Sequence, residues 1–195
     1  TDVLFFLFSK IKLYTKHSTA LSGVTQRTPI CYESLNDWTL SVNDTHGVTI
    51  VYIDFSRVFD TVSQNKLIDA RLTSYGIGRN LLNWLRNFIC GRTHQTRIGS
   101  AMSSIAKLFS GVIHGSGLGP LLFLTYINEL IEIMESCGVT IKLFADDAKV
   151  YAEINDNRDV EKLQHALDLL VQWAELWQLK MATNKCFTMN IGKIP

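Results

Sequence analysis

The sequence lacks closely spaced cysteines, repeats, and stretches rich in proline or glycine. Its four cysteines, Cys31, Cys90, Cys137 and Cys186, are scattered along the chain. This spacing excludes the short-range cysteine pairs of zinc sites and does not indicate a disulfide framework. Reduced thiols are typical of an intracellular protein, although they do not distinguish nucleus from cytoplasm. With three prolines and no linker among 195 residues, we expect one domain, or one domain and part of another.

A long apolar run is also missing. The most apolar segment near the N-terminus, residues 3–8 (VLFFLF), is far shorter than the roughly 20 residues that a membrane-spanning helix needs. It has neither the basic flank nor the small-residue cleavage site of a signal peptide. We therefore interpret it as part of a core, and no membrane is expected among the partners.

A strong net charge is the third absence, since the formal charge is only +1. The charges are nevertheless unevenly distributed. Residues 66–107 contain seven Lys or Arg and one acid, whereas residues 129–161 contain nine acids and three bases. The first stretch is suited to phosphates and the second to metal ions. Two solvated faces of different composition are the alternative interpretation.

Apolar periodicity indicates an alternation of strands and helices. Strands are predicted at 48–55, 139–145, 148–154 and 186–191, a hairpin at 93–99 and 104–109, and helices at 64–75, 79–90, 120–136 and 157–179. Pro120 suits the first turn of its helix. The tryptophans Trp38, Trp173 and Trp177 are expected in the core rather than in base stacking. The order of elements predicts an α+β fold, an antiparallel sheet with helices packed on one face.

Three aspartates stand at a strand end and in a turn, where each taken singly is usually a cap or turn former. Asp54 ends a buried apolar strand, and Asp146 and Asp147 form the turn between two other strands. Aspartate is unfavourable in strands, and an unpaired buried carboxylate is costly. If these strands are neighbours, the carboxylates meet at one edge of the sheet. Such hard oxygen ligands are suited to two Mg²⁺ ions, with Mn²⁺ as a substitute, which can clamp the oxygens of a phosphoryl transfer.

Four motifs in sequence order carry a family resemblance. They are residues 52–60 (YIDFSRVFD), residues 110–116 (SGVIHGS) followed by LGP at 118–120, residues 144–147 (FADD), and residues 184–186 (NKC). Together with the connecting stretches, from about residue 16 to residue 192, they resemble the reverse transcriptases of non-LTR (LINE-type) retrotransposons. The resemblance departs from the family pattern at Ile113 and His114, where Pro and Gln are usual.

The resemblance implies a polymerase palm with partial fingers and no thumb. Residues 47–195 would be the palm core, with a fingers-like or connecting insertion around 64–109, and residues 1–46 a remnant of the fingers. Lys16 is then the one candidate cation for the triphosphate. The missing fingers and thumb segments would belong to a longer polyprotein, so we expect this chain to be a fragment.

The resemblance also implies residue roles. Asp54, Asp146 and Asp147, with the Phe55 carbonyl, would bind the metal ions, and Lys185 would protonate the departing pyrophosphate. Phe59 would crowd a ribose 2′-hydroxyl, and Gly111, His114, Gly115 and Ser116 would lie against the nucleotide. Arg92 and Arg97 would contact the template or primer backbone. The alternatives are a core aromatic at Phe59, ordinary turn chemistry in the loop, and solvated surface cations.

The function that follows is RNA-directed DNA polymerase. A DNA primer on an RNA template would attack a deoxynucleoside triphosphate and release pyrophosphate. Two alternatives remain open. The chain could be an inactive remnant that binds nucleic acid or protein, or it could be another palm polymerase, such as an intron-type reverse transcriptase or an RNA-templated RNA polymerase.

Overall fold

The computed structural model describes residues 27–144 and 147–194, with side chains from residue 31 onward. The apolar run at 3–8, Lys16 and Asp146 lie outside these residues. The elements, in order, are α2 (Arg27–Asn43), β1 (Gly47–Asp54), α3 (Val58–Thr61), the π-helix η1 (Lys66–Leu72), α4 (Arg79–Ile89), β2 (Thr93–His94), β3 (Arg97–Ile98), β4 (Ala101–Met102), β5 (Ala106–Lys107), α5 (Gly119–Ile127), α6 (Glu129–Ser136), β6 (Thr140–Phe144), β7 (Asp147–Ile154), α7 (Asn157–Leu176), the 3₁₀ turn η2 (Thr183–Lys185) and β8 (Phe187–Ile191).

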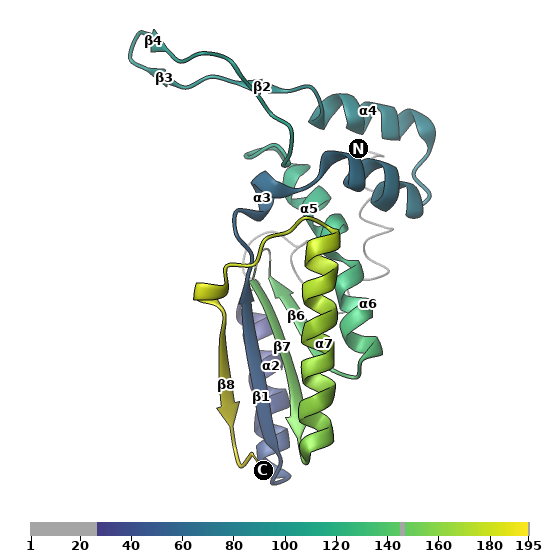
Figure 1. Ribbon diagram of the computed structural model, residues 1–195, viewed down its shortest axis with the longest axis vertical. Coiled ribbons are helices and arrows are strands. Elements are labelled where there is room, and N and C mark those ends of the chain that lie inside the picture. Colours follow the sequence, from purple (N-terminus) through teal and green to yellow (C-terminus); the bar gives the residue numbers. More distant parts are fainter. Residues whose placement is uncertain (1–26, 145–146, 195) are drawn as a thin grey trace.

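The four main strands form one antiparallel sheet in the order β6-β7-β1-β8 (Figure 1). Strand β1 is central, and both faces of it are apolar. Val51, Ile53 and Phe55 belong to the main core, whereas Val48 and Ile50 belong to a second cluster on the other face. Because side chains alternate along a strand, this continuous apolar run requires cover on both sides of the sheet.

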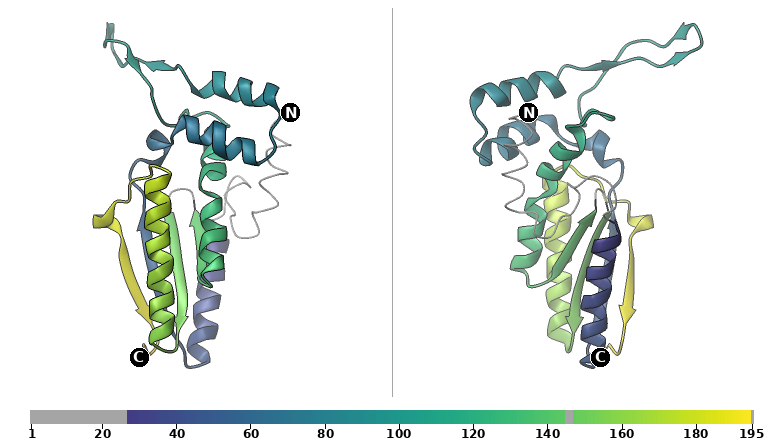
Figure 2. Two further views of the ribbon diagram at one scale, coloured as in Figure 1. Left: turned by 45° about the vertical axis from the view of Figure 1, so that its right-hand side comes forward. Right: turned by 180° about the vertical axis from the view of Figure 1, so that it is seen from behind.

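Helices cover both faces, which corrects the prediction of helices on one face. The main core contains apolar side chains of α5, α6 and α7, so these helices pack on one side of the sheet. Helix α2 lies on the opposite side of the sheet (Figure 2). There Trp38 packs edge-on against Tyr151. The sequence prediction missed α2 because its apolar residues are few and do not form a clear helical stripe. The α+β class and the antiparallel sheet are confirmed.

The predicted helix at 120–136 is two helices. Helix α5 contains Pro120 in its first turn, as expected, and α6 follows after Asn128. At this junction the Ile131 N–H bonds to the Asn128 carbonyl, three residues back rather than four. Both helices contribute apolar residues to the same core, so periodicity alone does not reveal the break.

The predicted hairpin at 93–109 is a long two-stranded arm. Strand β2 pairs with β5 and β3 with β4, and every residue from Gly91 to Ser110 is exposed. The arm extends away from the sheet beyond α4 (Figures 1 and 2).

All four cysteines are free. None of the helices among residues 27–144 and 147–194 is both long and apolar enough to cross a membrane.

Candidate active site

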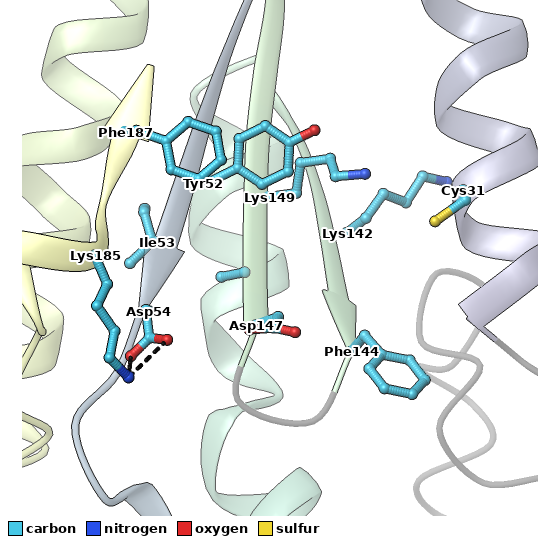
Figure 3. A pocket seen from close by; sticks show the side chains of 11 residues that line it. Cys31, Tyr52, Ile53, Asp54, Lys142, Phe144, Asp147, Lys149, Lys185 and Phe187 are labelled. Atoms are coloured by element: carbon cyan, nitrogen blue, oxygen red, sulfur yellow. Dashed lines mark hydrogen bonds and ion pairs between the residues drawn. The ribbon is translucent and has the colours of Figure 1, made fainter. Parts of the chain in front are cut away.

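Asp54 and Asp147 face one another at the end of the sheet. They are the last pair in the antiparallel register of β1 and β7. Residues directly opposite in such a ladder have Cβ atoms about 4.5–5.5 Å apart and point to the same face. Figure 3 shows the two carboxylates side by side on neighbouring strands. Two residues 93 positions apart in the sequence therefore meet, as the sequence interpretation requires. Asp146, the third carboxylate of that interpretation, lies outside the described residues.

Lys185 reaches this site from the segment before β8. Its Nζ atom lies 3.3 Å and 3.4 Å from the two carboxylate oxygens of Asp54 (Figure 3). Two backbone hydrogen bonds fix the approach, because the Ala182 N–H donates to the Asp54 carbonyl and the Ser56 N–H donates to the Lys180 carbonyl. The Lys185 side chain is mostly exposed, whereas that of Asp54 is 26% exposed. The lysine can therefore swing toward a ligand without breaking the core.

The donor set has the chemistry of a divalent cation site. Carboxylate oxygens suit hard cations such as Mg²⁺, which binds through one or two carboxylates and keeps several waters. Asp54 and Asp147 supply such oxygens, and Phe55, the next residue after Asp54, is buried beside them. Within the described part of the chain, from which Asp146 is excluded, no group of three metal-binding side chains gathers. The two described aspartates therefore fit part of a shared site.

A cavity of about 320 Å³ opens next to the carboxylates on the α2 side of the sheet. Tyr52 and Phe187 stack in its wall with ring centroids 4.5 Å apart (Figure 3). The Lys149 ammonium lies 5.3 Å from the Tyr52 ring centroid and 5.0 Å from that of Trp38. Burial lowers the pKa of Lys149 below its ordinary value. The cavity thus combines an aromatic wall with cations beside the acidic edge.

Phe59 and Gly111 bring the second motif against the first. The Phe59 ring lies 4.8 Å from that of Phe123 and 5.8 Å from that of His114. Gly111 has φ +89°, and a Cβ atom there would lie 2.7 Å from the Phe59 carbonyl oxygen. The Gly111 N–H donates to the Val62 carbonyl and the Val112 N–H donates to the Phe59 carbonyl, each at 2.8 Å. Glycine is required here because two backbones touch.

His114 pairs with a residue to which the sequence interpretation assigned no role. Its Nε2 atom lies 2.8 Å from Oδ1 of Asp60, and Ser110 Oγ donates to the Asp60 carbonyl at 2.7 Å. Buried Gln64 donates to the Gly111 carbonyl at 3.1 Å. Asp60 and Gln64 therefore hold the loop that contains His114. These contacts join residues about 50 positions apart, so no local sequence pattern could have revealed them.

Gly115 and Ser116 complete the turn before α5. The Ser116 hydroxyl donates to the Ile113 carbonyl at 2.6 Å and accepts from the Gly119 N–H at 2.9 Å. It thereby satisfies an amide at the start of α5. Gly115 is exposed with φ +72° and has open space where a side chain would stand. The loop leaves this glycine available to a ligand and uses the serine within the protein.

A family model described as reverse transcriptase (RNA-dependent DNA polymerase) matches residues 13–192. The chain belongs to this family. The reverse transcriptase resemblance of the four motifs is therefore confirmed over nearly the whole sequence.

Two of the curated relatives are proteins of Drosophila melanogaster mobile elements. The RNA-directed DNA polymerase from mobile element jockey is 29% identical over 121 residues, which is 57% of this chain and 13% of the relative. The probable RNA-directed DNA polymerase from transposon BS is 26% identical over 163 residues, 76% of this chain and 17% of the relative. The chain thus spans less than a fifth of the length of these proteins. The expected relation to non-LTR elements is confirmed.

Solved telomerases share the fold. A Candida tropicalis telomerase in complex with a fragment of telomeric RNA has a TM-score of 0.73 at 14% identity, covering 96% of this chain and 33% of that one. An apo form truncated from its C-terminal domain has a TM-score of 0.71, also at 14% identity, and covers 97% of this chain and 40% of that one. The reverse transcriptase architecture is therefore present in this chain at the level of fold.

Arg92 and Arg97 join neither the carboxylates with Lys185 nor the loop from Gly111 to Ser116. Arg92 lies between α4 and β2, and Arg97 lies on β3, in the exposed arm that leaves the sheet (Figure 1). The Arg92 Nε–H donates to the Phe88 carbonyl and the Arg97 Nε–H donates to the Gly99 carbonyl, each at 2.9 Å. In this reverse transcriptase chain the two arginines are therefore distant from the carboxylates, and any role in binding must be exerted through the arm.

Proposed function

We propose that this chain is the palm region of an RNA-directed DNA polymerase. The observation that carries the proposal is the pairing of Asp54 with Asp147 at the end of two neighbouring strands. Family membership supports the same activity. In the full protein the substrates would be a deoxynucleoside triphosphate, a DNA primer and an RNA template.

Each residue group has a part in that reaction. Asp54, Asp147 and Asp146, with the Phe55 carbonyl, would hold two Mg²⁺ ions or Mn²⁺ in their place. When bound, such ions stabilise charge on the attacking and leaving oxygens of an in-line displacement. Lys185 Nζ is 3.3 Å from Asp54, close enough to deliver a proton to pyrophosphate leaving that site. The protein contributes mainly positioning and electrostatic stabilisation.

The loop from Gly111 to Ser116 would support the incoming nucleotide. Phe59 packs on Phe123 and under His114, a position from which its ring would crowd a ribose 2′-hydroxyl and favour deoxynucleotides. His114 and Gly115 are exposed on the loop and would face the base and phosphates. Ser116 would act indirectly, through the turn that it holds. Arg92 and Arg97 would contact the nucleic-acid backbone from the arm.

Primer extension tests the proposal. The 195-residue chain, with a DNA primer on an RNA template, is expected to add deoxynucleotides only when Mg²⁺ or Mn²⁺ is supplied. Asp54→Asn should abolish extension, because a neutral amide is a poor ligand for a hard cation. Asp168→Asn is the matched control, since Asp168 is an exposed acid on α7, and it should extend like the unmodified chain.

The alternatives are distinguished by the same assay. If the chain binds RNA with a salt-sensitive affinity but does not extend the primer, it is a non-catalytic binding remnant. Extension by the Asp54→Asn variant would contradict the assignment of the site. The family match favours reverse transcriptase over an RNA-templated RNA polymerase. An intron-type reverse transcriptase would share the chemistry and differ in template.

A further inference from the structure

A stack of two aromatic side chains on α4 and one cation from the segment after it lies away from the carboxylates. The rings of Trp84 and Phe88 are stacked, with centroids 5.7 Å apart and planes 8° from parallel. The Arg92 guanidinium lies 5.7 Å from the Phe88 ring centroid. Trp84 and Phe88 are four positions apart on α4, which places them on one face of the helix. The helix ends at Ile89, and the chain turns through Cys90 and Gly91 before it reaches Arg92. Trp84 is 49% exposed although it is among the largest apolar side chains.

The stack continues into the arm, defined here as residues 91–110. The arm contains Arg92, Arg97, Lys107 and no acid, and the acid-free stretch extends from residue 70 to residue 128. Thr93 pairs with Lys107 and Arg97 with Met102, so both strands contribute to the charged surface. Phe109 adds an exposed ring at the base of the arm. A two-stranded ribbon is marginally stable alone, and none of the described residues covers this one.

The chemistry of this surface identifies its ligand. Cations without neighbouring acids favour a polyanion. The exposed Trp84 ring, which is stacked on half-buried Phe88, favours a ligand with planar faces, and bases stack on aromatic side chains with little regard for sequence. In a duplex those base faces are occupied by their neighbours. A protein partner would not require a surface that is free of acids.

We propose that Trp84, Phe88 and the arm bind a single-stranded stretch of nucleic acid, with bases stacked on Trp84 and phosphates paired with Arg92, Arg97 and Lys107. This rests on the proposed function, in which the chain acts on a template. Because stacking on Trp84 requires unpaired bases, the strand bound there would be template that is not yet paired with primer.

Tryptophan fluorescence gives a direct test, because Trp84 is the only exposed tryptophan of the four, all of which lie in the described part of the chain. Trp38, Trp173 and Trp177 are buried at 5%, 4% and 8% exposure. Titration with a single-stranded RNA 20-mer should quench the emission, and the same RNA as a duplex should quench it much less. Trp84→Leu should remove the quenching and weaken single-strand affinity about fivefold or more.

The salt dependence of binding tests the cations. Each single-strand phosphate contact contributes about 0.7 to the slope of log affinity against log salt concentration. Replacing Arg92, Arg97 and Lys107 together by serine should therefore reduce that slope by about 2. The matched control replaces three exposed cations, Arg158 and Lys162 at the start of α7 and Lys193 after β8, and should leave the slope unchanged. The start of α7 and the end of β8 lie at the end of the molecule opposite the arm (Figure 1).

The outcomes separate this inference from the proposed function. Two results would overturn the binding surface, whether or not the chain extends primers. One is equal quenching by single-stranded and duplex RNA. The other is a salt slope for the variant at Arg92, Arg97 and Lys107 that equals the slope of the control variant. Quenching and slope as expected, without any extension, support the surface and count against the polymerase. Asp168→Asn, at an exposed acid on α7, should leave both binding measurements unchanged.

Discussion

Gly111 shows how one residue joins two motifs. Its Cβ would lie 2.7 Å from the Phe59 carbonyl oxygen and 3.0 Å from Asp60 Cα, whereas Gly115, with a similar positive φ, has open space. Gly111→Ala should therefore lower the free energy of unfolding by about 1–3 kcal/mol more than Gly115→Ala. Urea unfolding of the two variants measures this difference. Equal losses would show that the close backbone contact does not contribute to stability.

Glu129 joins η1 to α6 and α7 through buried partners. Its Oε2 atom accepts from Arg71 at 2.5 Å and from Trp173 at 3.0 Å, and the Arg71 guanidinium lies 4.1 Å from the Trp177 ring centroid. The hydrogen bond from Arg71, followed by that from Trp173, lowers the pKa of Glu129 below its ordinary value of 4.5 despite the opposing effect of burial. The carboxylate therefore stabilises the fold above pH 4.5, and this contribution is lost as the pH falls through the lowered pKa.

Glu129→Gln should accordingly be less stable than the unmodified chain at pH 7, by about 1–3 kcal/mol, because Arg71 is left as a buried cation. The difference should shrink as the pH is lowered below 4.5. Asp69→Asn breaks the exposed pair with Arg86 and should cost less than about 1 kcal/mol. Chemical unfolding across a pH series compares the variants, and a difference for Glu129→Gln that is independent of pH would contradict the assignment.

At the scale of elements, the end of α7 is held by a left-handed turn. Gln178 has φ +60°, the Leu179 N–H donates to the Ala174 carbonyl at 2.8 Å, and the Gln178 N–H donates to that of Glu175 at 3.0 Å. This is the glycine-favouring termination in which two carbonyls at the helix end are satisfied. Replacing Gln178 by glycine should keep both bonds and remove the strain of a side chain.

Gln178→Gly is therefore expected to raise the free energy of unfolding by about 1 kcal/mol. Gln172→Gly, on the exposed face of α7 itself, should instead lower it by about 1 kcal/mol. Changes of opposite sign in the free energy of unfolding, measured by thermal or urea unfolding, would confirm that the two glutamines differ by backbone conformation alone. A loss at both positions would mean that the Gln178 side chain stabilises the turn.

The elements themselves were predictable where periodicity is strong. The strands around Ile50 and Val150 and the long amphipathic α7 agree with their predicted positions. Helix α2 was not predicted, because its packing on the sheet depends on long-range contacts such as Tyr151 with Asp37. The break at Asn128 was missed for a related reason, since both helices share one apolar core.

At the scale of the whole molecule, four distant motifs meet around one edge of a sheet. The sequence predicted that Asp54 and the turn at 146–147 would converge if their strands were neighbours. The register of β1 and β7 brings Asp54 and Asp147 together, and Asp146 lies outside the described residues. The sequence did not predict Asp60 and Gln64 as supports of the loop, or the separation of Arg92 and Arg97 from the carboxylates. These depend on the path of the chain between the motifs, which no single segment encodes.

The assignment of all three motif aspartates to one metal site is the central claim, and Mn²⁺ binding tests it without requiring catalysis. Electron paramagnetic resonance of free Mn²⁺ in titrations with the full chain measures affinity. Asp54→Asn and Asp147→Asn should each weaken binding by at least about tenfold, while Asp168→Asn leaves it unchanged. Binding that is insensitive to Asp54 and Asp147 alike would contradict the shared site.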